Sequence, residues 1–122
     1  ALQDAGMQPE QIDYINAHGT GTLNNDQVEL TGFTSFFEKV PPFASTKSYV
    51  GHTLGAAGAL EAIYSILALM HDEMYGSLNF ETPIEGLGLC PLSRSGQAPL
   101  QYVMSNSYGF SGNCTSLIFQ KA

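Results

Sequence analysis

The stretch TLGAAGALEAIYSILALM, residues 53–70, carries one charged residue, Glu61, among 18 positions. Its leucines and isoleucines are spread around the whole helical circumference, which is the pattern of a helix that is covered on every side. A predominantly apolar run of 18 residues also reaches the lower limit for crossing a bilayer. A carboxylate in mid-span would be costly in lipid, and no basic flank fixes an orientation. We therefore interpret the segment as the buried helix of a soluble protein, without a membrane span.

Helical and extended patterns alternate on both sides of this helix. The predicted elements are a final helical turn ending at Gly6, a strand at 12–16, a helix at 26–38, strands at 43–46 and 75–80, loops at 47–51 and 81–99, and two last strands at 100–105 and 116–120. Strands alternate with helices until two strands follow each other directly. This order predicts an α/β fold with a mixed sheet.

The length and charge of the chain limit what it can be. At 122 residues it has the size of one ordinary domain, and only 12% of its residues are charged, about half the usual share. A sheet of this size covers one face of the apolar helix, so a further layer of protein should lie on the other face. The net charge of −7 argues against nucleic acid as a partner.

Two histidines stand beside turns of small residues. INAHGTGT, residues 15–22, places His18 at a strand end, and STKSYVGH, residues 45–52, brings His52 to the start of the apolar helix. Open α/β sheets bind their ligands at such strand ends. Neutral imidazoles donate hydrogen bonds, so two that converge can stabilise an oxygen that gains negative charge in a transition state. A hydrogen-bonded structural histidine is the more common alternative for either one alone.

Other polar residues add to this region. Glu29 lies four residues before Phe33 on the inward face of its helix, and a buried carboxylate needs a partner. Lys47 would bias the protonation of the histidines, and we expect it to form an ion pair with Glu29. Thr20 and Thr22 place hydroxyls in an open loop, where they suit the amides of a long, thin substrate.

The sequence contains no familiar metal or phosphate motif. Cys90 and Cys114 lack the paired spacing of a zinc site, and we interpret them as reduced, buried thiols of a cytosolic protein. His71, beside Asp72 and Glu73, is expected to be a solvated cation at a helix end. There is no signal-peptide pattern, and a cytoplasmic location is expected.

Three motifs follow one another along the chain: AHGTGT with Asp26 and Glu29, STKSYVGHTLGAAGALEA, and SNSYGFSGN. Together they resemble the C-terminal half of the β-ketoacyl-[acyl-carrier-protein] synthases, condensing enzymes of the thiolase-fold superfamily. The likeness runs from Ala1 to about Lys121. It implies that residues 1–122 form the C-terminal domain of a five-layer αβαβα fold, with the central helix buried between two sheets. The N-terminal half, which carries the nucleophilic cysteine, is then absent from this chain.

The resemblance implies a role for the residues around the first two motifs. His18 and His52 resemble the two active-site histidines, which would stabilise the enolate formed when malonyl-carrier protein loses carbon dioxide. Lys47 is similar to the buried catalytic lysine of the family. Glu29 resembles the glutamate paired with that lysine, and Asp26 is expected to support the site.

The resemblance also implies how the substrate is bound. Thr20 and Thr22 resemble the threonines that bind the phosphopantetheine arm, and Phe110 resembles a gating phenylalanine whose N–H contributes to the oxyanion hole. Ser111 replaces a glycine of the usual Gly-Phe-Gly-Gly, and Cys114 stands where asparagine is usual. These two departures fall in the gate and leave the histidines in place.

The implied activity is decarboxylative Claisen condensation of malonyl-carrier protein with an enzyme-bound acyl group, in fatty acid or polyketide synthesis. The expected partners are acyl carrier protein, the N-terminal half and a second copy of the enzyme. No cofactor is expected on the chain itself, since phosphopantetheine arrives on the carrier protein, and no activity is expected from the chain alone. Two alternatives remain: a non-catalytic partner similar to a chain-length factor, and a separate binding module.

Overall fold

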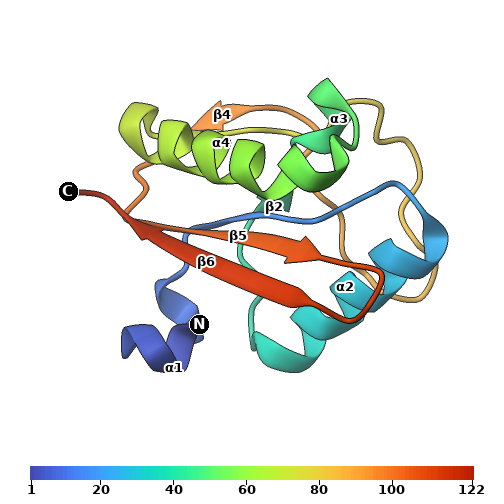
Figure 1. Ribbon diagram of the computed structural model, residues 1–122, viewed down its shortest axis with the longest axis horizontal. Helices are drawn as coiled ribbons and strands as arrows, with labels where there is room; N and C mark the ends of the chain where they lie inside the picture. Colours follow the sequence, from blue (N-terminus) through green and yellow to red (C-terminus); the bar gives the residue numbers. More distant parts are fainter.

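The computed structural model describes residues 1–122 as a four-stranded sheet with helices on both faces (Figure 1). In chain order the elements are α1 (Leu2–Ala5), the 3-10 helix η1 (Pro9–Gln11), β1 (Tyr14–Asn16), α2 (Leu23–Phe36), β2 (Phe43–Ala44), α3 (Lys47–Val50), the 3-10 helix η2 (Leu54–Ala56), α4 (Ala57–His71), β3 (Glu73–Met74), β4 (Gly96–Gln97), β5 (Tyr102–Tyr108) and β6 (Cys114–Gln120). The α/β class is confirmed.

The sheet has the strand order β2-β1-β5-β6. Strand β1 is parallel to β2 and to β5, whereas β5 and β6 form an antiparallel hairpin, so the predicted mixed sheet is confirmed. The carboxyl ends of β1, β2 and β5 meet at one edge of the sheet. His18 follows β1 there, Lys47 follows β2, and Tyr108 ends β5. Topology therefore gathers three distant motifs at one edge.

Alternate residues of each strand pack into two hydrophobic cores on opposite faces of the sheet. On the α2 face, Ile15 of β1 and Met104 of β5 pack in one cluster with Leu30 and Phe33. On the α4 face, Tyr14 and Val103 pack in another cluster with Ala68 and Leu69. The inward face predicted for the helix around Glu29 is thus confirmed.

Helix α4 is covered by the sheet along one side only. Its buried residues recur at helical spacing and are Ala57, Glu61, Ser65, Ala68 and Leu69. On the outer side Ile63, Ile66 and Met70 are 53%, 42% and 66% exposed. One sheet thus covers one face of the apolar helix, as its pattern predicts, and an apolar stripe remains open.

The span Leu54–His71 is long and apolar enough to cross a membrane by length and composition, with a mean hydropathy of 1.4. A single helix of this kind is weak evidence for a membrane protein, because core helices pass the same test. Glu61 faces the sheet and forms an ion pair with Lys47 there. That buried ion pair identifies α4 as a core helix.

Several expected boundaries differ from the structure. Residues 75–80 are not a strand: Ser77 N–H donates to the Leu92 carbonyl and Leu78 N–H to the Ser48 hydroxyl, so loop contacts replace a ladder. Residues 47–50 form the helical turn α3 instead of a loop. Helix α2 begins at Leu23, and the last two strands extend to 102–108 and 114–120. Gly6 ends α1 in the left-handed conformation, as expected.

Candidate active site

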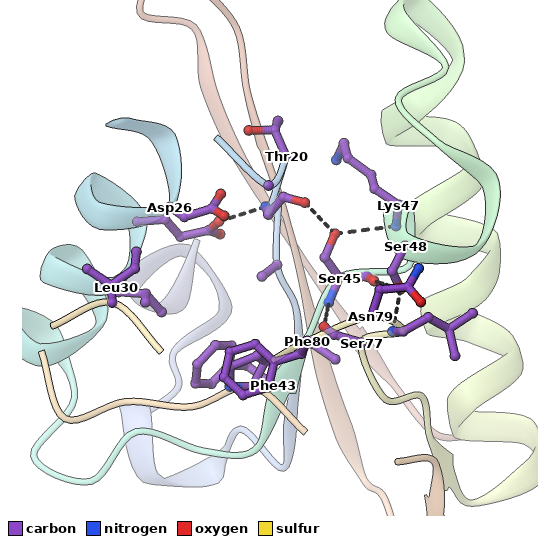
Figure 2. Close-up of a pocket in the computed structure, with 18 of the residues that line it drawn as sticks. Thr20, Asp26, Leu30, Phe43, Ser45, Lys47, Ser48, Ser77, Asn79 and Phe80 are labelled. Carbon is purple, nitrogen blue, oxygen red and sulfur yellow. Dashed lines mark hydrogen bonds between the residues drawn. The ribbon is translucent and has the colours of Figure 1, made fainter. Parts of the chain in front are cut away.

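The loop after β1 is fixed by a carboxylate and a hydroxyl. His18 is 5% exposed, and its N–H and that of Gly19 both donate to the Glu29 carboxylate at 2.9 Å. From the other side, the Ser45 hydroxyl donates to the Gly19 carbonyl at 2.8 Å. Ser45 in turn lies between Lys47 and Ser77 (Figure 2). Glu29 therefore holds the backbone of the histidine loop.

The predicted ion pair between Lys47 and Glu29 is wrong. Lys47 forms its ion pair with Glu61 of α4, and both side chains are buried. Its ammonium also donates to the His18 carbonyl at 2.6 Å and lies 3.1 Å from His18 Nδ1. The Ser107 hydroxyl donates to the second Glu61 oxygen at 3.3 Å. The one signal for Glu61 was its isolation as the only charge in an apolar helix, where a carboxylate needs a partner.

These contacts fix the tautomer of both histidines. A lysine ammonium can only donate, so His18 Nδ1 accepts and its proton resides on Nε2. His52 Nδ1 accepts the Leu54 N–H at 3.1 Å, which places its proton on Nε2 as well. The two ring centroids are 5.5 Å apart and the rings are nearly perpendicular. Each neutral imidazole therefore has one N–H donor left for a ligand.

The surroundings keep His18 neutral. Burial, followed by the Lys47 ammonium and His52, lowers the pKa of His18 to about 4. Burial also raises the pKa of Glu29, although the hydrogen bonds that its carboxylate accepts from the two backbone N–H groups lower it. Tyr108, whose ring centroid is 5.5 Å from that of His18, has its pKa raised by burial and by the nearby Glu29. Near neutral pH the imidazole therefore presents a hydrogen-bond donor without a net charge.

An open cleft of about 1100 Å³ lies in front of the two imidazoles. The predicted site residues that line it are His18, His52, Thr20, Thr22 and Phe110. The hydroxyl oxygens of Thr20 and Thr22 are 2.8 Å apart, and Phe110 is fully exposed in the turn between β5 and β6. The structure thus brings three separate motifs to one cleft. Tyr108 also lines it, and the only hint of this in the sequence was its place in SNSYGFSGN.

Asp26 does not line this cleft. It borders a second cavity of about 390 Å³ that lies between α2, α3 and residues 77–91. Figure 2 shows Asp26 and Lys47 on opposite sides of this cavity, with Phe43 and Phe80 below. Thr20 and His52 line both cavities, so the two spaces meet at the histidine loop. Asp26 therefore lines the second cavity and not the cleft with the imidazoles.

Both cysteines are exposed, so their interpretation as buried thiols is wrong. Cys114 begins β6 opposite Tyr108, and Cys90 lies in the long loop between β3 and β4. Neither lines the cleft with the histidines. His71 at the end of α4 is exposed, as expected.

Gly19→Ala is expected to lower the free energy of unfolding by about 1–3 kcal/mol and to displace His18. Gly19 has a φ of +36°, and a Cβ there would lie 2.6 Å from the Ser45 Cβ. Gly21, with a φ of +74°, has nothing within 4 Å of a Cβ, so Gly21→Ala is the matched control without a clash. Urea unfolding of both variants in the complete protein measures the difference. Equal losses of unfolding free energy in Gly19→Ala and Gly21→Ala would show that the close approach to Ser45 is unimportant.

Comparison with known proteins gives a consistent family. The profile described as "Beta-ketoacyl synthase, C-terminal domain" matches residues 1–81. The 3-oxoacyl-[acyl-carrier-protein] synthase 1 of Haemophilus influenzae is 48% identical over 113 residues, which are 90% of this chain and 28% of that protein. The chain thus spans less than a third of the length of this relative.

Solved structures agree with the sequence matches. "The ishigamide ketosynthase/chain length factor" superposes with a TM-score of 0.95 at 36% identity, over 100% of this chain and 31% of that one. A type II PKS acyl-carrier protein in complex with its ketosynthase, AntDE:AntF, gives a TM-score of 0.94 at 28% identity, with the same two coverages. The fold and the motifs therefore point to the same family.

Proposed function

The chain belongs to the β-ketoacyl synthase family as its C-terminal domain, and we propose that it supplies the two enolate-stabilising histidines of a β-ketoacyl-[acyl-carrier-protein] synthase. The observation that carries this proposal is the pair of neutral imidazoles at one cleft, each with its Nδ1 engaged by the protein. Such an arrangement leaves both Nε2–H groups for an oxyanion. The 3-oxoacyl-[acyl-carrier-protein] synthase relatives are acyltransferases, and we assign this activity to the complete protein.

The proposed step is the decarboxylation of a malonyl thioester. The bond between the α-carbon and the carboxylate breaks, carbon dioxide leaves, and the electron pair forms an enolate. The enolate oxygen accepts hydrogen bonds from Nε2–H of His18 and His52, which are prearranged for the charge that develops there. The enolate carbon then attacks the thioester carbonyl of an acyl group on a cysteine of the N-terminal domain, and the cysteine thiolate leaves.

The remaining cleft residues suit a carrier-borne substrate. Thr20 and Thr22 offer hydroxyls to the amides of the phosphopantetheine arm, and Phe110 stands at the cleft as its gate. In this proposal acyl carrier protein delivers the arm, so the chain itself binds no separate cofactor. The N-terminal domain covers the apolar outer side of α4, and the complete enzyme is a cytoplasmic homodimer. The chain alone, without the nucleophile, does not condense.

A second candidate is a non-catalytic partner resembling a chain-length factor. It is favoured by the likeness to a solved ketosynthase/chain length factor. Retention of His18, His52 and Lys47 in one connected arrangement favours the catalytic function instead. The two candidates differ in the domain that accompanies this chain: a synthase needs an acylated cysteine there, and a chain-length factor does not.

Acyl transfer distinguishes the two candidates. We expect the complete protein, incubated with an acyl thioester, to gain the mass of one acyl group, which peptide mapping places on a cysteine outside residues 1–122. Cys90 and Cys114 serve as internal controls, because both are exposed and neither lines the cleft. A protein that binds carrier protein but gains no acyl group would support the chain-length-factor function. Acylation of Cys90 or Cys114 would contradict the proposal outright.

A further inference from the structure

Asn16, the last residue of β1, is 1% exposed and sends its side chain between α3 and α4. Its Oδ1 accepts two hydrogen bonds from Thr46, from the N–H at 3.3 Å and from the hydroxyl at 3.2 Å. Its Nδ2 donates to the Glu61 carbonyl at 3.2 Å and to the Ser65 hydroxyl at 3.5 Å. An asparagine amide has two donors and two acceptor sites, and all four are used here.

The two ends of this amide hold the backbones that carry the buried ion pair. Thr46 immediately precedes Lys47, and the Glu61 carbonyl belongs to the residue whose carboxylate meets the Lys47 ammonium. The same ammonium contacts His18, two residues after Asn16 in the chain. We propose that Asn16 is a positioning residue, which fixes the Lys47–Glu61 pair against His18 and so maintains the action of the lysine on that histidine.

A purely structural role would not require this pattern of bonds. Tyr14, two residues earlier in β1, is also fully buried on the α4 face, but its hydroxyl donates at 3.0 Å to the Tyr75 carbonyl, beyond the end of α4. That bond reaches neither Thr46 nor Glu61. Asn16 instead bridges β1, α3 and α4 with one group. Loss of Asn16 should therefore change the position of Lys47 relative to His18, whereas loss of the Tyr14 hydroxyl should not.

This inference rests on the proposed function, because its readout is the decarboxylation of a malonyl thioester. The charged or titratable groups around His18 are Lys47 from α3, Glu61 from α4, Glu29 and Asp26 from α2, His52 from the segment before η2, and Tyr108 from β5. Burial is the largest cause of the lowered pKa of His18 and the Lys47 ammonium adds to it, so a displaced Lys47 lets that pKa rise from about 4 part of the way toward its ordinary value. Protonation at Nδ1 removes the acceptor that Lys47 uses.

We measure the decarboxylation rate as a function of pH and expect Asn16→Ala to move the acid limb of this pH–rate profile to higher pH. Between about pH 7.5 and 5.5 the rate of Asn16→Ala should fall by up to about tenfold more than that of the unaltered synthase, the limit set by an ordinary histidine pKa of ~6.5. Tyr14→Phe is the matched control: it removes a buried hydroxyl from the same strand and the same face, outside the bonds of Asn16, and should leave the limb in place. A limb that stays in place in Asn16→Ala would overturn the inference.

Two further variants keep the test decisive. Thr46→Val preserves volume and removes one bond to Asn16, so it should shift the limb in the same direction by less, even if Asn16→Ala does not fold. In a Lys47→Met background, Asn16→Ala should cause no additional shift, because its effect passes through the lysine. An equal shift of the limb in both backgrounds, or an equal shift in Tyr14→Phe, would contradict the positioning role of Asn16. His18→Ala separates the two claims: if it leaves decarboxylation intact, the proposed function itself fails.

Discussion

Replacing His18 by alanine is expected to slow the release of carbon dioxide from malonyl-carrier protein by about 10²–10³-fold, the loss seen when one oxyanion donor is removed. The reason is geometric: the Nδ1 of His18 is taken by Lys47, so its Nε2–H is its remaining donor, and the ring borders the cleft beside His52. The measurement is carbon dioxide release by the complete synthase. The Lys47 ammonium keeps the carbonyl at position 18 and Glu61 as partners, so the variant should fold.

His71→Ala is the matched control for that substitution. His71 is an exposed histidine at the end of α4 and lines neither the cleft nor the second cavity. We expect its carbon dioxide release to equal that of the unaltered protein. If His18→Ala retained a rate within a few-fold of His71→Ala, enolate stabilisation by His18 would be wrong.

The second large effect concerns stability. Glu61→Gln is expected to lower the free energy of unfolding by about 3–5 kcal/mol, because it leaves the Lys47 ammonium buried without a counter-charge. Lys47 and Glu61 have side-chain exposures of 6% and 3%. Lys121→Met is the control, because the Lys121–Asp72 pair is 34% and 41% exposed, and an ion pair open to solvent contributes little to stability. Urea unfolding of the complete synthase measures both.

A double substitution separates stability from chemistry. Lys47→Met with Glu61→Leu removes both buried charges together, and such replacements are often neutral or stabilising. We therefore expect the double variant to regain most of the stability that Glu61→Gln loses, while decarboxylation stays impaired because His18 has lost its lysine. Similar losses of stability in Glu61→Gln and Lys121→Met would show that the buried pair is not a major contributor.

The sequence alone located the edge of the sheet where the site lies. His18 could be placed because a half-buried strand ends just before it, and His52 because an apolar helix begins just after it. Lys47, Thr20 and Thr22 could be singled out as polar residues of the same region, and the resemblance to a known family then implied their roles and added Phe110. All of these except Lys47 line the same cleft, and Lys47 contacts His18 from behind.

The hydrogen bonds and ion pairs between side chains could not be predicted from the sequence. Glu29 and Glu61 are both single carboxylates on inward helix faces, and periodicity cannot tell which one meets Lys47. The placement of the two helices decides which carboxylate Lys47 meets. Helix α4 lies on the face of the sheet to which the side chain of Asn16 points, and it brings Glu61 to Lys47. Helix α2 lies on the other face and brings Glu29 to the backbone of the loop after β1. Residues 75–80 differ from the prediction for a similar reason: the segment suits a short strand when taken alone, but tertiary hydrogen bonds of Ser77 and Leu78 hold it as a loop.

The central claim is that this chain provides the decarboxylating half of a condensing enzyme. Its most direct test is to supply the complete synthase with malonyl-carrier protein and an acyl thioester, and to measure carbon dioxide and the β-ketoacyl product together. We predict that both appear in equal amounts. Binding of carrier protein with neither carbon dioxide nor product would contradict the claim, and would identify the chain as part of a non-catalytic partner.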